Sequence, residues 1–282
     1  MKTHIEKDSI KTRKSIRTYT GEKLSASDKN LLLKYINHAE NRVGFHGNQI
    51  KIQLIEVDEM TSDKIGTYGI IKDAPAFLVI SCKNNREALF DCGYVVERMV
   101  LYLAQNGLAS CWLGGTFHRA KIIEKVTLLP DEIIPIILPV GYGEKKRSFS
   151  DKMVRSLAKG DSRLAFDDLF FCENFTQKIK DPNLRGILDL VRLAPSASNK
   201  QPWRILMDAN GDMHFYLKRT PKYAGSIGYD IQWLDMGISA AHYEVACGSN
   251  QFFVQPPETD KAFDSLEYVI SAKHLSAATA IG

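Results

Sequence analysis

Apolar residues in the first half of the chain recur with two kinds of spacing. Spacings of three to four residues predict helices over residues 31–41 and over the longer segment 90–105, which ends before Gly107. Alternating or continuous apolar runs predict strands, and they occupy residues 50–56, 76–80, 109–115 and 133–143. Weaker patterns predict a polar first helix over residues 4–12 and a short helix over 119–126. Helices and strands therefore alternate through this half.

The second half shows a similar succession of patterns. Apolar spacing predicts a helix over residues 183–193 and another over residues 230–246. Between these helices, Asn210 and Gly211 form a strong signal for a hairpin turn. Strands are predicted at residues 204–207, 213–217, 252–254 and 268–271.

A polar and basic bridge, residues 144–163, separates the two halves. We therefore place the boundary near its end and predict domains 1–160 and 161–282. A short repeat relates the halves, because Asp-x-Gly occurs at residues 91–93 and again at 235–237, each time near the start of a long helix. This match favours an internal duplication, although the halves are otherwise dissimilar.

The composition is that of an ordinary soluble globular protein of 282 residues, with 44% hydrophobic and 25% charged residues. A net charge of +4 is too small and too scattered to indicate nucleic acid, but a local cluster would suit an anionic small ligand. The five dispersed cysteines form no C-x-x-C pair, which predicts reduced thiols and a cytoplasmic location. No apolar leader is present, and no apolar run approaches the ~18 residues that span a bilayer, so we expect no membrane association.

Common catalytic motifs are missing from the sequence. The seven histidines are scattered without the H-E-x-x-H pattern, so we expect no metal site. The chain contains no G-x-G-x-x-G or G-x-x-x-x-G-K-[ST] phosphate loop and no G-x-S-x-G nucleophile elbow. We therefore assign no catalytic residue, and we expect that the chemistry of an enzyme of this kind belongs to a bound cofactor.

The stretch A-P-S-A-S-N-K-Q-P-W, residues 194–203, is the richest in polar groups that could face a ligand. Two prolines disfavour helix at the residues that precede them, so the path between them is irregular or extended. Its serine, asparagine and glutamine side chains can offer donors and acceptors to a planar polar ligand. Taken alone, the same residues also fit an ordinary loop between a helix and a strand.

Two cationic groups and a pair of glycines complete the candidate chemistry. Arg13 and Arg17 flank a serine, which suits a phosphate, although such clusters are more often solvated helix ends. Lys146 and Arg147 follow a predicted strand and fit either a phosphate or a solubilising linker equally well. The glycines at 114–115 allow close approach of a ligand ring, or simply a tight turn.

The segment R-K-S-I-R-T-Y, residues 13–19, resembles the R-R-S-x-R-x-F signature of FMN-dependent nitroreductases. Residues 194–203 look like the A-P-S-x-x-N-x-Q-P-W segment of the same family. The order differs, because in that family this segment follows the arginine motif within a few tens of residues, whereas here it lies in the second half. The resemblance implies an α+β, nitroreductase-like fold of two similar halves, each a mostly antiparallel sheet flanked by helices. It also implies a fused pseudo-dimer, a monomer that mimics the family homodimer, with one intact FMN site and one lost.

The resemblance also implies roles for particular residues. The phosphate and ribityl end of FMN would be held by Arg13, Lys14, Ser15 and Arg17, with Lys146 and Arg147 added. The second half would contribute Pro195, Ser196, Ala197, Asn199 and Gln201. Leu113, Gly114 and Gly115 would lie near the reactive edge of the flavin. The family often has an acidic residue beside such a glycine, and this chain has none.

The function that the resemblance implies is ping-pong hydride transfer from NAD(P)H through FMN to a small-molecule acceptor such as a nitroaromatic or a quinone. A second hypothesis is a flavin-binding or flavin-storage protein with little turnover. A third is a binding module without flavin, whose basic bridge, residues 145–163, meets an anionic partner.

Overall fold

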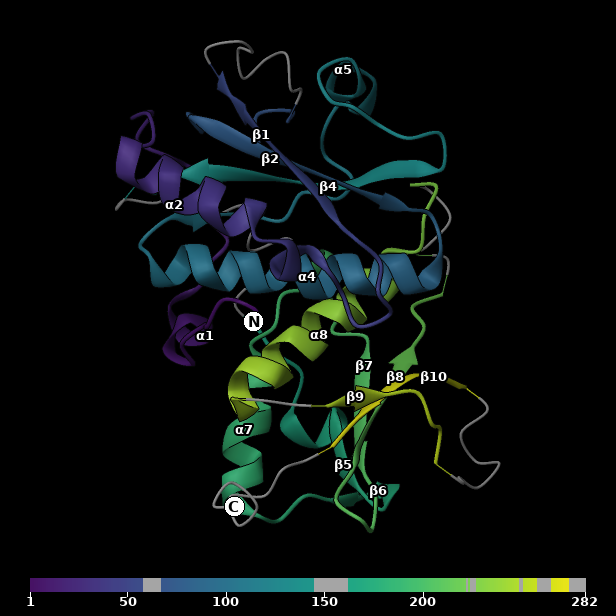
Figure 1. The fold of residues 1–282 in the computed structure, drawn as a ribbon. Coiled ribbons are helices and arrows are strands. Elements are labelled where there is room, and N and C mark those ends of the chain that lie inside the picture. Colours follow the sequence, from purple (N-terminus) through teal and green to yellow (C-terminus); the bar gives the residue numbers. More distant parts are fainter. Residues whose placement is uncertain are drawn as a thin grey trace.

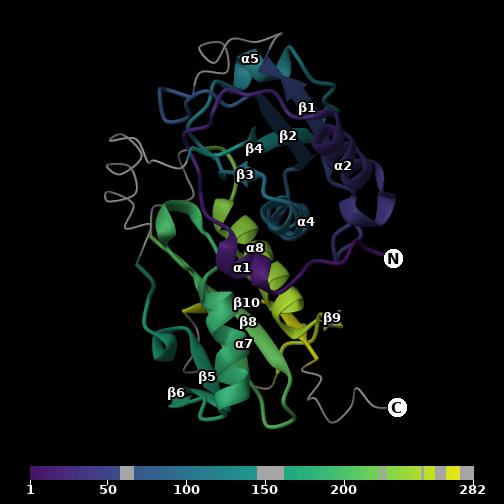
Figure 2. The same ribbon diagram turned by 90° about the vertical axis from the view of Figure 1, so that its left-hand side faces the viewer.

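The computed structural model describes residues 1–57, 67–144, 162–221, 223, 227–248, 251–257 and 265–273. In this part of the chain, two sheets lie on either side of a central pair of long helices, α4 (Arg86–Gln105) and α8 (Ile231–Cys247) (Figure 1). The view from the side shows α4 nearly end-on, between the upper sheet and α8 (Figure 2). The protein is α+β, with mostly antiparallel sheets flanked by helices, as the resemblance implied.

The first sheet has the strand order β1-β2-β4-β3, and every neighbouring pair is antiparallel. Its strands are β1 (Lys51–Glu56), β2 (Ala76–Lys83), β3 (Ala109–Ser110) and β4 (Glu132–Gly141). Helices α2 (Ala26–Asn37) and α4 share one face, and Tyr35 stacks on Tyr102 there with ring centroids 4.5 Å apart. The short helix α5 (Arg119–Ile123) packs on the other face through Ile122. Both faces of this sheet are therefore covered, which explains the continuous apolar runs of β2 and β4.

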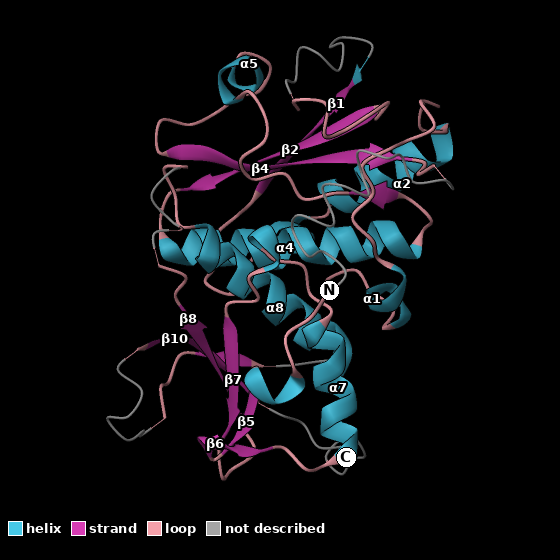
Figure 3. Ribbon diagram, turned by 180° about the vertical axis from the view of Figure 1, so that it is seen from behind, coloured by secondary structure: helices cyan, strands magenta, loops and turns pink. Residues whose placement is uncertain are grey.

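The second sheet has the order β6-β5-β7-β8-β10-β9. Its strands are β5 (Phe170–Cys172), β6 (Asn174–Lys178), β7 (Trp203–Met207), β8 (Met213–Lys218), β9 (Phe252–Phe253) and β10 (Leu266–Ala272). Within it, β7-β8-β10-β9 repeats the order and the antiparallel pairing of β1-β2-β4-β3. Figure 3 shows this sheet beside α8 and α7 (Pro182–Arg192). The recurrence extends the Asp-x-Gly match from a short motif to a whole arrangement of strands.

The two central helices cross at the repeated Asp-x-Gly. Gly93 of α4 lies so close to α8 that a Cβ atom would overlap the carbonyl oxygen of Leu234. Gly237 of α8 faces α4 in the same way, and a Cβ atom there would overlap the carbonyl oxygen of Phe90. Each glycine thus meets the residue that precedes the other Asp-x-Gly. The contact is reciprocal, like an interface between two copies related by a two-fold axis, and only glycine permits this approach.

Most of the predicted elements are present, and their ends follow the expected local chemistry. Ser25 caps α2, and Gly107 follows α4 with a φ of 76° and a hydrogen bond from its N–H to Ala104. The predicted first helix is only α1 (Asp8–Thr12), and α5 is shorter than its predicted range. Strands β5 and β6 were not predicted from the sequence. They extend the second sheet beyond the four repeated strands β7-β8-β10-β9. No described helix combines the length and the apolar character needed to cross a membrane.

Candidate functional site

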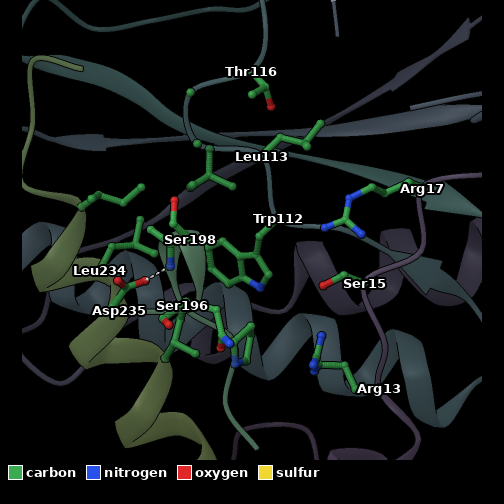
Figure 4. A pocket seen from close by; sticks show the side chains of 18 of the residues that line it. Arg13, Ser15, Arg17, Trp112, Leu113, Thr116, Ser196, Ser198, Leu234 and Asp235 are labelled. Carbon is green, nitrogen blue, oxygen red and sulfur yellow. Dashed lines mark hydrogen bonds between the residues drawn. The ribbon is translucent and has the colours of Figure 1, made fainter. Parts of the chain in front are cut away.

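A cavity of about 650 Å³ lies where the two halves meet (Figure 4). One side is the segment 13–17 that follows α1, and the other includes the loop 195–199 between α7 and β7. The loop 112–116 after β3 contributes a further wall. Helix α8 contributes the apolar side chains of Ile231, Leu234 and Ile238, together with Asp235. Segments far apart in the sequence, from both halves, thus surround one space.

The segment 13–17 is extended, so the directions of its side chains follow from the backbone. The backbone of Ser15 and Ile16 pairs with β3, and the Ile16 N–H donates to that strand over 3.0 Å. Successive side chains of extended backbone point to opposite sides. Arg13, Ser15 and Arg17 therefore share one side, and Figure 4 shows all three along the same edge of the cavity.

Arg13 has an unused hydrogen-bond donor at this edge. Its side chain is 9% exposed, and its Nε lies 3.8 Å from Oε1 of Glu97 on α4. This distance is too long for a hydrogen bond, and among the described residues the buried Nε has no hydrogen-bond partner. Buried charged groups normally have their hydrogen bonds satisfied. The orphaned donor therefore suits an anionic group entering from the cavity.

The wall formed by the loop 112–116 is largely backbone at Gly114. Leu113 exchanges two backbone hydrogen bonds of 3.1 Å with Ile137, which fixes the loop to β4. A Cβ atom on Gly114 would lie only 2.9 Å from Cδ1 of Ile231 and 3.1 Å from the hydroxyl of Tyr229. This hydroxyl donates to the Gly114 carbonyl over 2.9 Å. Glycine at this position therefore lets Ile231 and Tyr229 pack closely against the loop, and Gly114 itself lines the cavity.

The loop on the opposite side is strained. Ser198, Asn199 and Gln201 have φ angles of 47°, 54° and 48°, in the left-handed region that non-glycine residues rarely adopt. The Ala197 N–H donates over 2.9 Å to Oδ1 of Asp235, which fixes the loop to α8. Such strain persists only where surrounding contacts enforce it, and it is concentrated at functional sites.

Gln201 differs from its expected position. It is 2% exposed and does not line the cavity. Its Oε1 accepts from the Leu164 N–H over 3.0 Å, and its Nε2 donates to the Asn199 carbonyl over 3.2 Å. Its backbone N–H donates to Oγ of Ser196 over 2.9 Å. Gln201 thus lies behind the loop and supports it through these hydrogen bonds.

The other predicted residues that the structure describes all line the cavity. They are Arg13, Lys14, Ser15, Arg17, Leu113, Gly114, Gly115, Pro195, Ser196, Ala197 and Asn199. Lys146 and Arg147 lie outside the described residues.

Sequence reasoning missed several lining residues. They include Lys11, Trp112, Thr116, Arg163, Ser198, Tyr223 and Asp235. Asp235 belongs to the repeated Asp-x-Gly. In the sequence this repeat indicates a duplication, and it does not by itself indicate a ligand site. Arg163 lies at the end of the basic bridge, and it braces the loop because its guanidinium donates to the Leu193 carbonyl over 3.2 Å.

The cavity is strongly cationic. Its described lining includes five basic residues and one acidic residue, Asp235. The basic residues are Lys11, Arg13, Lys14, Arg17 and Arg163. An excess of positive charge in a partly enclosed space favours an anionic ligand. Among the described residues, no group of three or more His, Cys, Asp or Glu side chains could hold a metal ion.

A fully buried Glu97 links several walls of the cavity. Its Oε2 accepts from the Trp112 indole N–H over 2.7 Å, and its Oε1 lies 2.9 Å from Nε2 of His242 on α8. The other ring nitrogen of His242, Nδ1, lies 3.0 Å from the Leu190 carbonyl of α7. Because a carbonyl only accepts, Nδ1 carries a proton, and Nε2 and Oε1 share another. This network fixes the Trp112 side chain against α4 and links α4 to α8 and α7.

Comparison with known structures gives the same fold over nearly the whole chain. A protein from Thermotoga maritima described as a "putative nitroreductase" matches with a TM-score of 0.60 at 18% identity, covering 96% of this chain and 94% of that one. A nitroreductase with bound FMN from Bacteroides fragilis matches about half of this chain, with a TM-score of 0.40, 19% identity and 90% of its own chain covered.

Sequence comparisons point to the same family. A protein of Methanothermobacter thermautotrophicus named "Putative NADH dehydrogenase/NAD(P)H nitroreductase" is 25% identical over 145 residues, which are 48% of this chain and 75% of that protein. The family described as "Putative TM nitroreductase" matches residues 6–247. The match covers most of the sequence and both walls of the cavity, and the chain therefore belongs to this nitroreductase family.

Proposed function

We propose that this protein is an FMN-dependent NAD(P)H oxidoreductase with its one cofactor site in the cavity between the halves. The observation that carries the proposal is the convergence of the cationic segment 13–17 from the first half and the strained loop 195–199 from the second. Membership of a nitroreductase family supports the reaction class.

The residues of the cavity fit FMN in three respects. Arg13, Ser15 and Arg17 offer charged and hydroxyl donors to its phosphate, and the orphaned Nε of Arg13 accounts for one of them. The backbone at Gly114 and the apolar side of α8 suit a flat ring system. The loop 195–199 adds hydroxyl and amide groups for the ribityl chain.

When bound, FMN would supply two-electron transfer between NAD(P)H and an acceptor such as a nitroaromatic or a quinone. The protein's own contribution is to bind and orient the partners. A donor and an acceptor would use the space beside the flavin in turn, as a ping-pong reaction requires.

We further propose one FMN per chain and a monomer that mimics a homodimer. The region related to the cavity by the helix crossing contains several aromatic side chains in contact with one another. Phe252 contacts Phe45 and Tyr94 edge-to-face, with ring centroids 6.1 and 6.0 Å apart. On α4, Phe90 and Tyr94 occupy the helix positions that Leu234 and Ile238 occupy on α8.

The absorption spectrum of the purified protein tests this proposal. We expect a yellow protein with about one FMN per chain, bleached by NAD(P)H without oxygen. A stoichiometry near two contradicts the single site. Lack of flavin absorbance, with salt-sensitive binding of polyanions, favours instead a module that binds an anionic partner.

The double variant Arg13→Ala/Arg17→Ala tests the phosphate assignment. Each charge-assisted hydrogen bond contributes about 1.5–3 kcal/mol, so we expect FMN affinity to fall at least about a hundredfold. Riboflavin lacks the phosphate, so its weaker binding should change far less. Lys29→Ala/Lys83→Ala is the matched control, because both lysines lie in ion pairs with Glu56 and Asp131 outside the cavity. Equal losses for FMN and riboflavin would remove the phosphate assignment.

A flavin-storage function is the second candidate, and the wall at Gly114 favours it, because no acidic side chain stands beside this glycine. Anaerobic stopped-flow mixing with NAD(P)H distinguishes the two functions. Reduction within the turnover time supports the oxidoreductase, and bound flavin that stays oxidised supports storage.

A further inference from the structure

The two aspartates of the repeat stand at equivalent helix positions but differ in their hydrogen bonds. Asp91 has both carboxyl oxygens satisfied. Its Oδ1 accepts from the His46 N–H over 3.1 Å, and its Oδ2 accepts from the N–H and the side-chain amide of Asn48 over 3.1 and 2.9 Å. Asp235 has one oxygen satisfied, by the Ala197 N–H, whereas its Oδ2 is buried and has no hydrogen-bond partner among the described residues.

The surroundings of Asp235 favour its uncharged form. The residue is 1% exposed and lines the cavity between the apolar side chains of α8. Burial raises the pKa of Asp235 well above its ordinary value, and the charge of Asp230 adds to the rise, while the hydrogen bond from Ala197 opposes it. Figure 4 shows Arg13 and Arg17 on the opposite side of the cavity, away from this carboxyl group.

Other titratable or charged groups near Asp235 do not reverse this balance. They are Asp230 at the start of the same helix, and Tyr223 and Tyr229 before it. Burial raises the pKa of both tyrosines, so they remain neutral at physiological pH and do not stabilise a carboxylate by charge.

We propose that Asp235 is a neutral carboxylic acid whose Oδ2–H donates a hydrogen bond to an acceptor atom of the ligand in the cavity. This inference rests on the proposed function for the identity of that ligand, FMN. A buried hydroxyl without a partner is costly, so a ligand that supplies an acceptor gains affinity from it. The neutral form also avoids repulsion of an anionic ligand. At Asp91 every oxygen is already engaged, so the equivalent group cannot serve a ligand.

Two substitutions of Asp235 separate a donor from an acceptor. Asp235→Asn keeps an oxygen for the Ala197 N–H and places an NH₂ donor where Oδ2–H stood, so FMN affinity should stay within about threefold of the wild-type value. Asp235→Leu removes both groups, and affinity should fall about tenfold. Equal losses in both variants overturn the proposal, because an ionised acceptor would be lost in each. Unchanged affinity in the Leu variant also overturns it.

The protonation itself has a direct readout in the ligand-free protein. Infrared difference spectra between the wild type and Asp235→Asn at neutral pH should show the carbonyl stretch of a protonated carboxylic acid. Its absence overturns the proposal even if FMN binds. Failure of the wild-type protein to bind FMN overturns the proposed function instead, and the infrared band still decides the state of Asp235.

Discussion

The same Asp-x-Gly arrangement occurs on both helices of the central crossing, but the loops beside it differ between the two halves. Gly93 and Gly237 make the same contact with the opposite helix, and each follows an aspartate that holds a loop. In the first half the loop closes on its aspartate with three hydrogen bonds. In the second half a single hydrogen bond joins the loop to its aspartate, and a cavity remains open beside it. The crossing is therefore required for the fold in both halves, whereas the loop chemistry decides which half has a site.

The glycines of the crossing should give the largest effect, and it should be equal in both halves. In Gly93→Ala or Gly237→Ala the new Cβ meets a backbone carbonyl that cannot move independently, so the helices must separate. We expect each variant to lose about 3 kcal/mol or more in the free energy of unfolding, measured in urea.

Gly186→Ala is the control for these two variants. Gly186 lies within α7, and no atom lies within 4 Å of a Cβ placed there. Alanine is the better helix former, so stability should stay equal or rise by about 0.5–1 kcal/mol. A large difference between the Gly93 and Gly237 variants would contradict the reciprocity of the crossing.

Glu97 marks where the two helices differ, because the equivalent position on α8 is Ala241. Glu97→Ala leaves the Trp112 indole and His242 without their buried partner, so we expect a loss of about 3 kcal/mol in the free energy of unfolding. Glu97→Gln can still accept from the indole and donate to a neutral imidazole, so it should lose less than about 1 kcal/mol. If both variants lose the same amount, the charge of Glu97 is required in addition to its hydrogen bonds.

The paired variants Asp91→Asn and Asp235→Asn should differ in stability by about 2 kcal/mol. An asparagine at position 91 turns an NH₂ group toward backbone donors and leaves at least one of them unpaired. At position 235 the asparagine side chain offers one acceptor and one donor group, as a protonated aspartic acid does. Urea unfolding at neutral pH measures both variants, and equal losses would contradict the contrast between the two loops.

The pH dependence of stability gives the effect most specific to Asp235. Because burial raises the pKa of Asp235 in the folded state, the native protein holds a proton that the unfolded chain releases above about pH 4. This residue therefore costs increasing stability as the pH rises from about 4 toward its folded pKa. Asp235→Asn cannot titrate, so its stability relative to the wild type should improve over the same interval. A constant difference from pH 4 to 8 would show that Asp235 ionises normally.

Local signals in the sequence were enough to identify most elements. The caps at Ser25 and Gly107 and the turn at Asn210 depend on a few neighbouring residues, so they are readable without the fold. The short strands β5 and β6 were missed because they contain only a few residues each and lack a regular alternation. The motif residues of the cavity were readable only through a resemblance, since as isolated loops and charges they fitted ordinary structural roles equally well.

The sequence by itself determined the helices, most strands, the arginine segment and the polar loop, because spacing and turn chemistry act over short distances. Only the tertiary structure decided that residues 13–17 and 195–199 face one cavity, that Gln201 lies behind it, and that Asp235 has a free oxygen within it. Those properties depend on how two halves that are distant in the sequence pack together where α4 and α8 cross at Gly93 and Gly237. Burial near this crossing determines which polar groups have hydrogen-bond partners. The same Asp-x-Gly therefore supports a closed loop in one half and an open site in the other.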